Sequence, residues 1–298
     1  MHAFMTGTTG YIGGSVAAWL VRHGITVSGL VRTEANAAEL GGLGIRPVLG
    51  DLYDAELLRS ACRDADVVIN AASADNPYPV ATFLQALAGT GKRFIHTSGS
   101  SIAGDLAYGE PSDAVYDEYT MPPIRLEKRA RVAIDQAVLE AVDTGIVSSV
   151  ICPSMIYGPG LGLKPESAQV PMLISAARRR GGAAVVGRVL NRWANVHIED
   201  LCELYRLLAT SAPQRGFYFA ENGEAALIDI ARSINSSMHT SGEPTSLSIR
   251  ESIALWGPEA ASFALGSNSR VRARNAKALS WQPKHDSLLE DAARLSLA

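Results

Sequence analysis

The sequence predicts an α/β protein in which helices cover both faces of an open, doubly wound parallel sheet. Two observations support this fold class. A glycine-rich turn at 5–14 follows a short apolar run and leads directly into an amphipathic helix. Further along, short apolar segments alternate with helical patterns as far as about residue 152, and some, such as 67–69, are apolar throughout. Strands that are buried on both faces need such runs, and the alternation is typical of right-handed βαβ units.

Composition narrows the functional class. Of the 298 residues, 47% are hydrophobic and 19% are charged, which favours a large folded core over disorder. The net charge is −3 and no basic stripe with interleaved aromatic residues is present, so we expect no nucleic-acid partner. No apolar run approaches a membrane span, and the first residues lack the pattern of a secretory signal. We therefore expect a cytoplasmic protein that acts on a small molecule.

The three cysteines, Cys62, Cys152 and Cys202, lie far apart and form no C-x-x-C pair. This spacing is unlike a disulfide framework or a zinc site, and it suits a reducing compartment. We expect each cysteine to be a small buried side chain and expect no bound metal.

The glycine-rich turn is the strongest local signal. Gly7, Gly10 and Gly13 are spaced as G-x-x-G-x-x-G between the strand and the helix. Glycines allow the backbone to turn sharply and to approach an anion, and the first free amides of a helix point toward it. The turn therefore predicts a phosphate cradle, although a strand-to-helix turn without a ligand has the same appearance.

The first half of the chain can be divided into alternating elements. The first helix carries its apolar residues on one face and stops near Gly24. The expected strands are 3–5, 25–31, 46–49, 67–69, 93–97 and 147–152. The expected helices are 35–40, 54–63, 80–88 and a long one at 122–142.

After Pro153 the alternation changes. A turn-rich loop at 153–165 is followed by expected helices at 171–180, 199–209, 225–234 and 250–255, with strands at 195–198 and 217–220. We expect a dinucleotide-binding core at 1–160 and a smaller substrate lobe at 161–298, with segments returning to the core. Ligands of such sheets bind beyond the carboxyl ends of the strands, where the glycine turn lies.

Six segments, in order, resemble the short-chain dehydrogenase/reductase superfamily in its extended or atypical branch, which includes NAD-dependent epimerase/dehydratase-like proteins. They are TGTTGYIGG (6–14), GDLYD (50–54), VVINAAS (67–73), FIHTSGSS (94–101), PSMIYGPG (153–160) and NVHIEDL (195–201). The tail at 266–283 is also similar to the closing segment of epimerase-like members. The resemblance covers most of the chain and implies a Rossmann-type sheet.

The resemblance implies cofactor-binding roles by position. Asp51 and Leu52 would border the adenine, although a loop cap explains Asp51 equally well. Around the pyrophosphate it places Gly7, Thr9, Gly10, Tyr11, Ile12 and Gly13. Along the ribose and nicotinamide it places Ala71, Ala72, Ser73, Thr97, Ser98, Lys128, Pro153, Met155 and Ile156.

The end of the second strand bears on cofactor choice. NAD-preferring members place an acid there to accept the ribose 2′-hydroxyl, whereas this chain has Val31 followed by Arg32. An arginine can form a charge-assisted fork on a 2′-phosphate. We therefore predict NADP(H) rather than NAD(H); the alternative is that Arg32 is a solvated surface residue.

The catalytic pair of the family departs from its pattern. The resemblance implies Tyr-x-x-x-Lys, in which the lysine lowers the pKa of the tyrosine. Lys128 stands at the lysine position, but Ile124 stands four residues before it. The serine position falls on Gly99, between Ser98 and Ser100, and we assign Ser100 as its preferred replacement.

Three alternatives follow for the missing tyrosine. Lys128 itself could serve as acid and base, a loop tyrosine could replace the missing one, or the protein could bind the cofactor without turnover. The loop tyrosines are Tyr108, Tyr116 and Tyr119. Lys128 also lies in the charged run 127–131, which reads equally well as a solvated helix face.

The preferred function is an NADP(H)-dependent oxidoreductase for a carbonyl, imine or activated double bond of a small molecule, with Lys128 and Ser100 as catalytic residues. One alternative is a cofactor-sensing regulator resembling NmrA-like proteins. A second is a sugar-nucleotide epimerase or dehydratase, against which Ile124 argues. A homodimer through the helix at 122–142 is a family expectation; its apolar residues could equally belong to the core.

Overall fold

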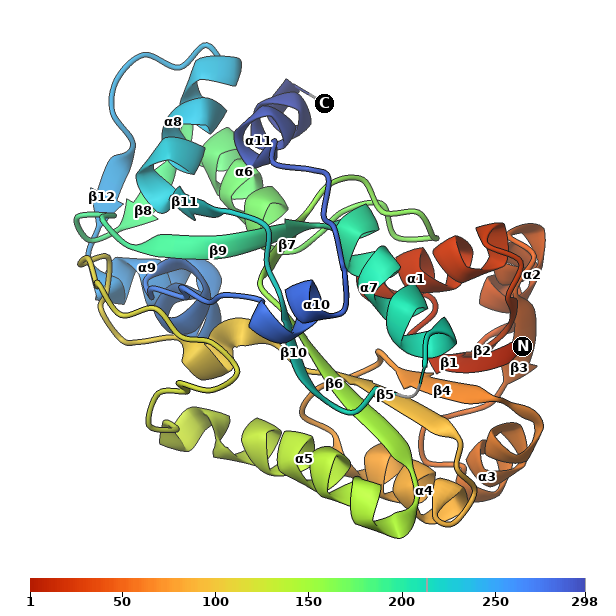
Figure 1. Cartoon of the computed structure of the whole chain (residues 1–298). Coiled ribbons are helices and arrows are strands. Elements are labelled where there is room, and N and C mark those ends of the chain that lie inside the picture. The colour runs from red at the N-terminus through yellow and green to blue at the C-terminus, as the bar shows by residue number, and fades with distance from the viewer. Residues whose placement is uncertain (213, 298) are drawn as a thin grey trace.

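A seven-stranded parallel sheet forms the centre of the protein (Figure 1). The computed structural model describes residues 1–212 and 214–297. The strand order is β10-β6-β5-β4-β1-β2-β3, and every neighbouring pair is parallel. The strands are β1 (His2–Thr6), β2 (Thr26–Val31), β3 (Arg46–Leu49), β4 (Val67–Asn70), β5 (Arg93–Thr97), β6 (Val147–Pro153) and β10 (Gly216–Ala220). This arrangement confirms the predicted fold class.

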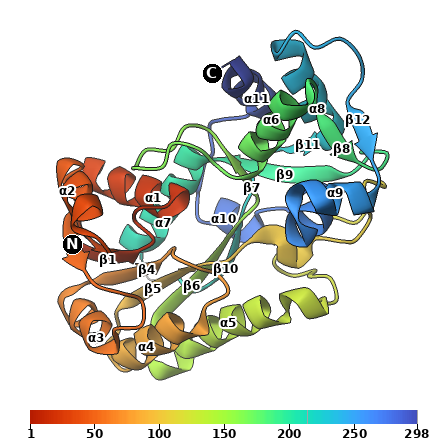
Figure 2. The same ribbon diagram turned by 180° about the vertical axis from the view of Figure 1, so that it is seen from behind.

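Helices cover both faces of the sheet, as Figures 1 and 2 show from opposite sides. One face carries α1 (Tyr11–Arg22), α2 (Glu34–Gly42) and α7 (Ile198–Thr210). The other carries α3 (Ala55–Asp64), α4 (Pro77–Leu87) and α5 (Arg129–Glu140). Each layer encloses its own apolar cluster, with Leu20 and Leu204 in the first and Phe83 and Val138 in the second. The double coverage explains why the central strands are apolar on both faces.

The second half of the chain returns to the core. Both α7, which packs beside α1, and β10, which pairs with β6 at the edge of the sheet, come from beyond residue 161. The remaining segments form a lobe with a third apolar cluster. Its strands are β7 (Met155–Tyr157), β8 (Ala184–Val186), β9 (Arg192–His197), β11 (Glu224–Ala226) and β12 (Thr245–Leu247). Its helices are α6 (Gln169–Arg180), α8 (Leu227–Ser237), α9 (Ile249–Trp256) and α11 (Leu288–Leu297), whereas α10 (Arg274–Ala278) packs against β10 of the central sheet.

The long helix is shorter than the sequence pattern predicts. Instead of spanning 122–142, α5 begins at Arg129, after a single 3₁₀ turn at Leu126–Lys128. Prolines 122 and 123 are compatible with a first helical turn but do not impose one, and here they lie in the loop before the 3₁₀ turn. Of the apolar residues considered for a dimer interface, Ile134, Val138 and Ala141 are buried in the core, whereas Ala130 and Ala137 are exposed.

The three cysteines behave as small buried side chains. Cys62, Cys152 and Cys202 are all buried and free. Burial raises the pKa of each thiol, so each stays protonated. Among the described residues, no helix is both long and apolar enough to cross a membrane.

Candidate functional site

The glycine turn packs so tightly that side chains have no room at two of its positions. Gly7 has φ +76°, and a Cβ there would overlap the carbonyl of Ala71 at the end of β4. A Cβ on Gly13 would overlap the carbonyl of Gly7 itself. The turn is closed by a hydrogen bond from the Gly10 amide to the Gly7 carbonyl, at 2.9 Å. The sequence therefore needs glycine at these places to bring β1, α1 and β4 together.

The start of α1 is suited to an anion. Gly10 is the N-cap residue and no side chain caps the helix, nor does its first turn contain an acid. The first amides of α1 therefore keep donors and a positive partial charge at the cavity. A dinucleotide diphosphate fits this cradle because it supplies the missing acceptors and the negative charge.

A loop from the second half of the chain covers the first turns of α1. The Tyr11 hydroxyl donates to the Gly158 carbonyl at 2.8 Å. The Leu161 amide donates to Ser15 Oγ at 3.0 Å. Gly162 lies against Gly14 so closely that a Cβ on Gly162 would overlap the Gly14 backbone. The turn-rich segment 158–163 therefore fixes the position of the cradle relative to the lobe.

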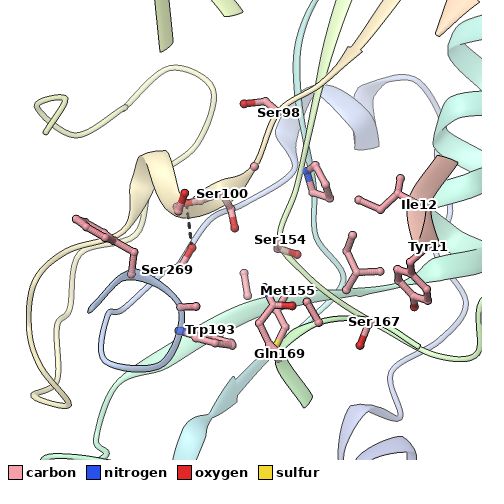
Figure 3. Close-up of a pocket in the computed structure, with 18 of the residues that line it drawn as sticks. Tyr11, Ile12, Ser98, Ser100, Ser154, Met155, Ser167, Gln169, Trp193 and Ser269 are labelled. Atoms are coloured by element: carbon pink, nitrogen blue, oxygen red, sulfur yellow. Dashed lines mark hydrogen bonds between the residues drawn. The ribbon is translucent and has the colours of Figure 1, made fainter. Parts of the chain in front are cut away.

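A cavity of about 420 Å³ extends from this cradle to the serine-rich end of β5 (Figure 3). Tyr11 and Ile12 lie on one side of it, and Ser98, Ser100 and Ser269 on the other. Its wall from the core consists of Gly10, Tyr11, Ile12, Gly13, Ala71, Ser98, Gly99, Ser100, Ser101, Arg131, Pro153, Ser154, Met155 and Ile156. Its wall from the rest of the chain consists of Lys164, Ser167, Ala168, Gln169, Trp193, Ala194, Glu259, Phe263, Ala264 and Ser269.

Nine of the predicted cofactor residues line this cavity, and Ser100 lines it too. They are Gly10, Tyr11, Ile12, Gly13, Ala71, Ser98, Pro153, Met155 and Ile156. Gly7 supports the turn from behind, and the Thr97 hydroxyl turns away to Tyr205, at 2.6 Å. The remaining predicted residues lie outside the lining: Thr9, Arg32, Asp51, Leu52, Ala72, Ser73 and Lys128.

Arg32 and Asp51 lie at the carboxyl edge of the sheet, beyond the cavity. Arg32 directly follows β2 and is exposed, and Asp51 follows β3. An Asp51 carboxylate oxygen accepts the Tyr53 amide at 2.9 Å, so this residue acts as a local turn cap. Both remain accessible to the adenosine half of a dinucleotide.

Lys128 lies behind one wall of the cavity. The side chain is buried, and its ammonium pairs with Glu259 and lies 4.3 Å from the centre of the Phe263 ring. Glu259 and Phe263 themselves line the cavity. In this structure the segment 259–263 therefore separates the Lys128 ammonium from the cavity.

Arg131 is the cation of α5 that lines the cavity. Its guanidinium makes a two-pronged contact with Asp75, at 2.9 and 2.6 Å, and donates to Ser101 Oγ at 2.8 Å. This pairing holds the pKa of the Asp75 carboxyl below its usual value. Arg131 thereby ties α5 to the loop that follows β4.

Asp135 lies one helical turn beyond Arg131 and supports the cavity from the interior. One of its carboxylate oxygens accepts the Ser98 hydroxyl at 2.6 Å. Burial raises the pKa of the Asp135 carboxyl to about 7. Sequence reasoning missed both Arg131 and Asp135, although their spacing of four residues on a predicted helix placed them on one face.

None of the loop tyrosines lines the cavity. Tyr116 forms a β-bridge with Val271, and the Tyr119 hydroxyl donates to Asn275 at 2.6 Å. Tyr108 is exposed. Among the described residues, Tyr11 is the one tyrosine in the lining, and its hydroxyl is engaged by Gly158. Burial raises the pKa of Tyr11 far above its usual value, which makes it a poor acid.

The lobe contributes side chains that no local pattern could reveal. Trp193, Ser269 and Gln169 reach the cavity from segments distant in the sequence. The Ser269 hydroxyl donates to the Ser100 carbonyl at 3.2 Å, and this hydrogen bond links the lobe to the core. Arg270 and Arg272, by contrast, pair with Glu224 outside the cavity.

One histidine and carboxylate group has spacing that could suit a metal: His197, Glu199 and His285. The two imidazole rings stack with centroids 3.9 Å apart at an angle of 20°. Their nitrogen lone pairs therefore lie in nearly parallel planes, which does not direct them at one ion. His197 Nδ1 already accepts the Glu199 amide at 3.2 Å and caps α7.

Residues 3–218 match the NAD-dependent epimerase/dehydratase family. An oxidase of Acremonium sp., ucsJ, is 31% identical over 97% of this chain and 94% of its own length. A 4-hydroxy-2-methyl-3-oxo-4-farnesyl-3,4-dihydroquinoline-1-oxide ketoreductase of Stigmatella aurantiaca is 29% identical over 75% of this chain and 69% of its own length.

The fold is shared with solved structures of low sequence identity. The dTDP-glucose 4,6-dehydratase of Bacillus anthracis in complex with NAD superposes with a TM-score of 0.78 at 16% identity, covering 99% of this chain and 96% of that one. At this identity the similarity shows the fold alone. The extent of the family match, together with the glycine cradle, means that this chain belongs to the NAD-dependent epimerase/dehydratase family.

Proposed function

We propose that this protein is an NADP(H)-dependent oxidoreductase that acts on a carbonyl, imine or activated double bond of a small molecule. The observation that carries the proposal is the continuity of the cavity, which joins the diphosphate cradle at α1 to the serine-rich end of β5. A nicotinamide cofactor, when bound, supplies or accepts the hydride. Relatives named as an oxidase and a ketoreductase support an oxidoreductase.

The residues along the cavity divide into two roles. The amides at the start of α1 would hold the diphosphate, and Pro153, Met155 and Ile156 would contact the nicotinamide. Ser98 and Ser100 line the cavity and would donate hydrogen bonds to a substrate carbonyl oxygen. The walls nearby combine the apolar Trp193 with polar Gln169 and Ser269, which suits a mainly uncharged substrate.

Lys128 remains a predicted catalytic residue whose role depends on movement. Its ammonium would reach the cavity only if the segment 259–263 shifted and its pairing with Glu259 were released. This arrangement also supports the second candidate function, a cofactor-binding regulator without turnover. The two functions differ in one measurement: NADPH oxidation in the presence of a panel of aldehydes, ketones, imines and enones. NADPH binding without turnover of any of them would favour the regulator.

Cofactor choice is tested at Arg32. We expect Arg32→Ala to weaken NADPH binding about tenfold or more, because one charge-assisted contact to the 2′-phosphate is lost, and to leave NADH binding unchanged. Isothermal titration calorimetry with both cofactors measures the two affinities. Arg46→Ala is the matched control. Arg46 is also exposed, but it lies at the amino-terminal end of β3, whereas Arg32 follows the carboxyl end of β2. Equal NADPH affinity in Arg32→Ala and the parent protein would contradict the role of Arg32.

A further inference from the structure

A chain of buried polar side chains runs beneath the cavity, from the end of β1 to Ser98. The Thr6 hydroxyl donates to Asn70 Oδ1 at 2.6 Å, and Asn70 Nδ2 lies 3.1 Å from His96 Nδ1. His96 Nε2 faces Asp135 Oδ1 at 3.7 Å, and the other oxygen of Asp135 accepts the Ser98 hydroxyl. All five side chains are buried among apolar residues. Polar groups are costly to bury unless they are hydrogen-bonded, and among the described residues His96 Nε2 and Asp135 Oδ1 have no partner within hydrogen-bond distance.

The hydrogen bonds between Thr6, Asn70 and His96 indicate which ring nitrogen of His96 carries the proton. Because Thr6 donates to the Asn70 carbonyl oxygen, the Asn70 amide group must donate to His96 Nδ1. His96 therefore carries its proton on Nε2, directed toward Asp135. Burial lowers the pKa of His96 to about 4, so the imidazole is neutral at physiological pH. A neutral His96 imidazole cannot offset a negative charge on the Asp135 carboxylate. A proton that Asp135 exchanges with Ser98 is therefore held by Asp135 and not by His96.

The surroundings of Asp135 bring the pKa of its carboxyl close to neutral pH, where the protonated and the ionised forms are both populated. Asp135 is 3% exposed. His96 of β5 and Ser98, which directly follows β5, face it from the sheet, as does the Cys152 thiol of β6. The charged groups around it are Arg131 on its own helix and Asp75 in the loop after β4. Burial and the Asp75 charge favour the protonated form, whereas Ser98 and Arg131 favour the carboxylate. The pKa of about 7 follows from burial as the largest of these influences.

Ser98 connects this interior acid to the cavity. Its side chain lines the cavity on one side and contacts Asp135 on the other. The tyrosine in the lining is engaged by Gly158, and the Lys128 ammonium is paired with Glu259 behind the wall. A carbonyl reduction needs a proton at the substrate oxygen, and the Ser98 hydroxyl lines the cavity with a carboxyl group directly behind it.

We propose that Ser98 and Asp135 form a proton-delivery pair, in which Ser98 protonates the substrate oxygen and Asp135 resupplies Ser98. The inference rests on the proposed reductase function. The carbonyl carbon accepts a hydride, with its two electrons, from the reduced nicotinamide, which is thereby oxidised. When Asp135 is protonated, its carboxyl donates to Ser98 Oγ across the same 2.6 Å contact, and the Ser98 proton is free to point into the cavity. The carbonyl oxygen then takes the proton of the Ser98 hydroxyl as the Asp135 carboxyl proton moves to Ser98 Oγ. Asp135 is left as a carboxylate, and a proton from the solvent returns to it through Ser98 after the product leaves. Ser98 is the catalytic residue of the pair, and Asp135 is a positioning residue that acts through it.

The protonation of Asp135 can be measured without turnover. Carbon-13 NMR of protein labelled at the aspartate carboxyls, with Asp135→Asn to identify the signal, follows its titration. We expect a midpoint near pH 7, and a shift of that midpoint when NADPH binds next to Ser98. The matched control is Asp200→Asn, which alters a buried carboxyl that accepts the Lys284 and His285 amides elsewhere in the fold. An Asp135 signal that is fully ionised at pH 6 would overturn the pair.

Kinetics then separate proton delivery from structural support. We expect kcat to fall about a hundredfold in Ser98→Ala and in Asp135→Asn, while NADPH affinity in Asp135→Asn, which lies behind the lining, stays within about twofold. Ser98→Thr, which keeps a hydroxyl, should recover most of the rate. In the parent kcat should decline above pH 7, and this decline should vanish in Asp135→Asn. An unchanged pH profile in Asp135→Asn would overturn the proposal.

The two failures remain distinguishable. If the parent protein reduces no member of the substrate panel, the proposed reductase function has failed, and the NMR titration alone decides the state of Asp135. If the parent is active and Asp135→Asn retains its full rate, the reductase stands and the proton-delivery pair falls.

Discussion

The two sides of the cavity are built by different means. The α1 side depends on a closely packed backbone turn, in which Gly7 and Gly13 are required because no side chain fits there. On the β5 side the contacting groups are side chains, among them Ser98, Ser100 and Arg131. The first side would hold the diphosphate of a dinucleotide, and the second would hold the part of the ligand on which chemistry and specificity depend.

The difference also concerns distance along the chain. The cradle is complete within nine residues, apart from the end of β4 against which it packs. The other side combines β5 with α5 and with segments of the lobe such as Trp193 and Ser269. Changes on the α1 side should therefore act on folding and cofactor binding together, whereas changes on the β5 side should act on reaction steps and on pH dependence.

The largest expected effect is at Gly13. In Gly13→Ala the new Cβ overlaps the Gly7 carbonyl, and because that atom is backbone the turn itself must move. We expect a loss of about 3 kcal/mol in the free energy of unfolding, together with loss of cofactor binding. Urea denaturation monitored by circular dichroism measures the first, and calorimetry the second.

The control for this substitution is Gly41→Ala. Gly41 lies within α2, and no atom stands within 4 Å of the position of its Cβ. An alanine there should stabilise the protein by about 0.5–1 kcal/mol, since it restricts the unfolded chain without a clash. A Gly13→Ala protein as stable as its parent would show that the cradle is not tightly packed.

A smaller effect is expected from the pH dependence of stability on the β5 side. The folded-state pKa of Asp135 is raised to about 7, so its contribution to stability falls as pH rises from about 4 to about 7. The folded-state pKa of His96 is lowered to about 4, so its contribution rises between pH 4 and about 6.5. The two slopes oppose each other, so Asp135 and His96 together should add little net pH dependence to the stability of the parent in this range.

Asp135→Asn removes one of the two opposing slopes. Relative to the parent, this variant should become more stable as pH rises from 4 to 7, by on the order of 2 kcal/mol. Urea midpoints measured at half-unit pH steps give the comparison. Parallel stability curves for variant and parent would mean that Asp135 is ionised throughout and carries no proton at neutral pH.

The sequence predicts the α1 side of the cavity better than the β5 side, because the residues of the α1 side are close together in the chain. The fold class and the glycine-rich turn were predicted, because strand apolarity and turn chemistry depend on neighbours in the chain. The loop predicted at 153–165 was wrong in its first part, since Pro153 ends β6 and Met155–Tyr157 form β7 by pairing with the distant β9. The predicted long helix was wrong at its start: the sequence pattern places it at 122, whereas α5 begins at Arg129. The two prolines were treated as a helix start, but they precede a loop and a single 3₁₀ turn.

The other side could not be predicted in the same way. Arg131 was grouped with its charged neighbours in 127–131 as one solvated face, yet the helix begins between Lys128 and Arg129 and turns Arg131 toward the cavity. Lys128 was placed beside the cofactor by its position in a motif, but Glu259 and Phe263 cover it. Both outcomes depend on where a helix starts and on contacts with the lobe, which spacing does not encode.

The smallest expected effect concerns Arg131 and Asp75. In Arg131→Met the Asp75 carboxyl loses the partner that lowers its pKa, so that pKa should rise toward its usual value. A depressed pKa contributes stability above the unfolded-state value, and this contribution is lost as pH falls. We expect the variant to be about 1 kcal/mol less stable than the parent at pH 7, with a difference that narrows in acid. Thermal unfolding at pH 7 and pH 3 measures both values.

Two further variants distinguish geometry from charge at this position. Arg131→Lys keeps the positive charge but cannot make the two-pronged contact with Asp75, so its stability should lie between those of Arg131→Met and the parent. Arg129→Met, at an exposed neighbouring position on the same helix, should have little effect. If Arg131→Lys equals the parent, charge alone holds the loop after β4 to α5. In that case the β5 side would tolerate changes of shape that the glycine cradle cannot, and the contrast between the two sides would become sharper.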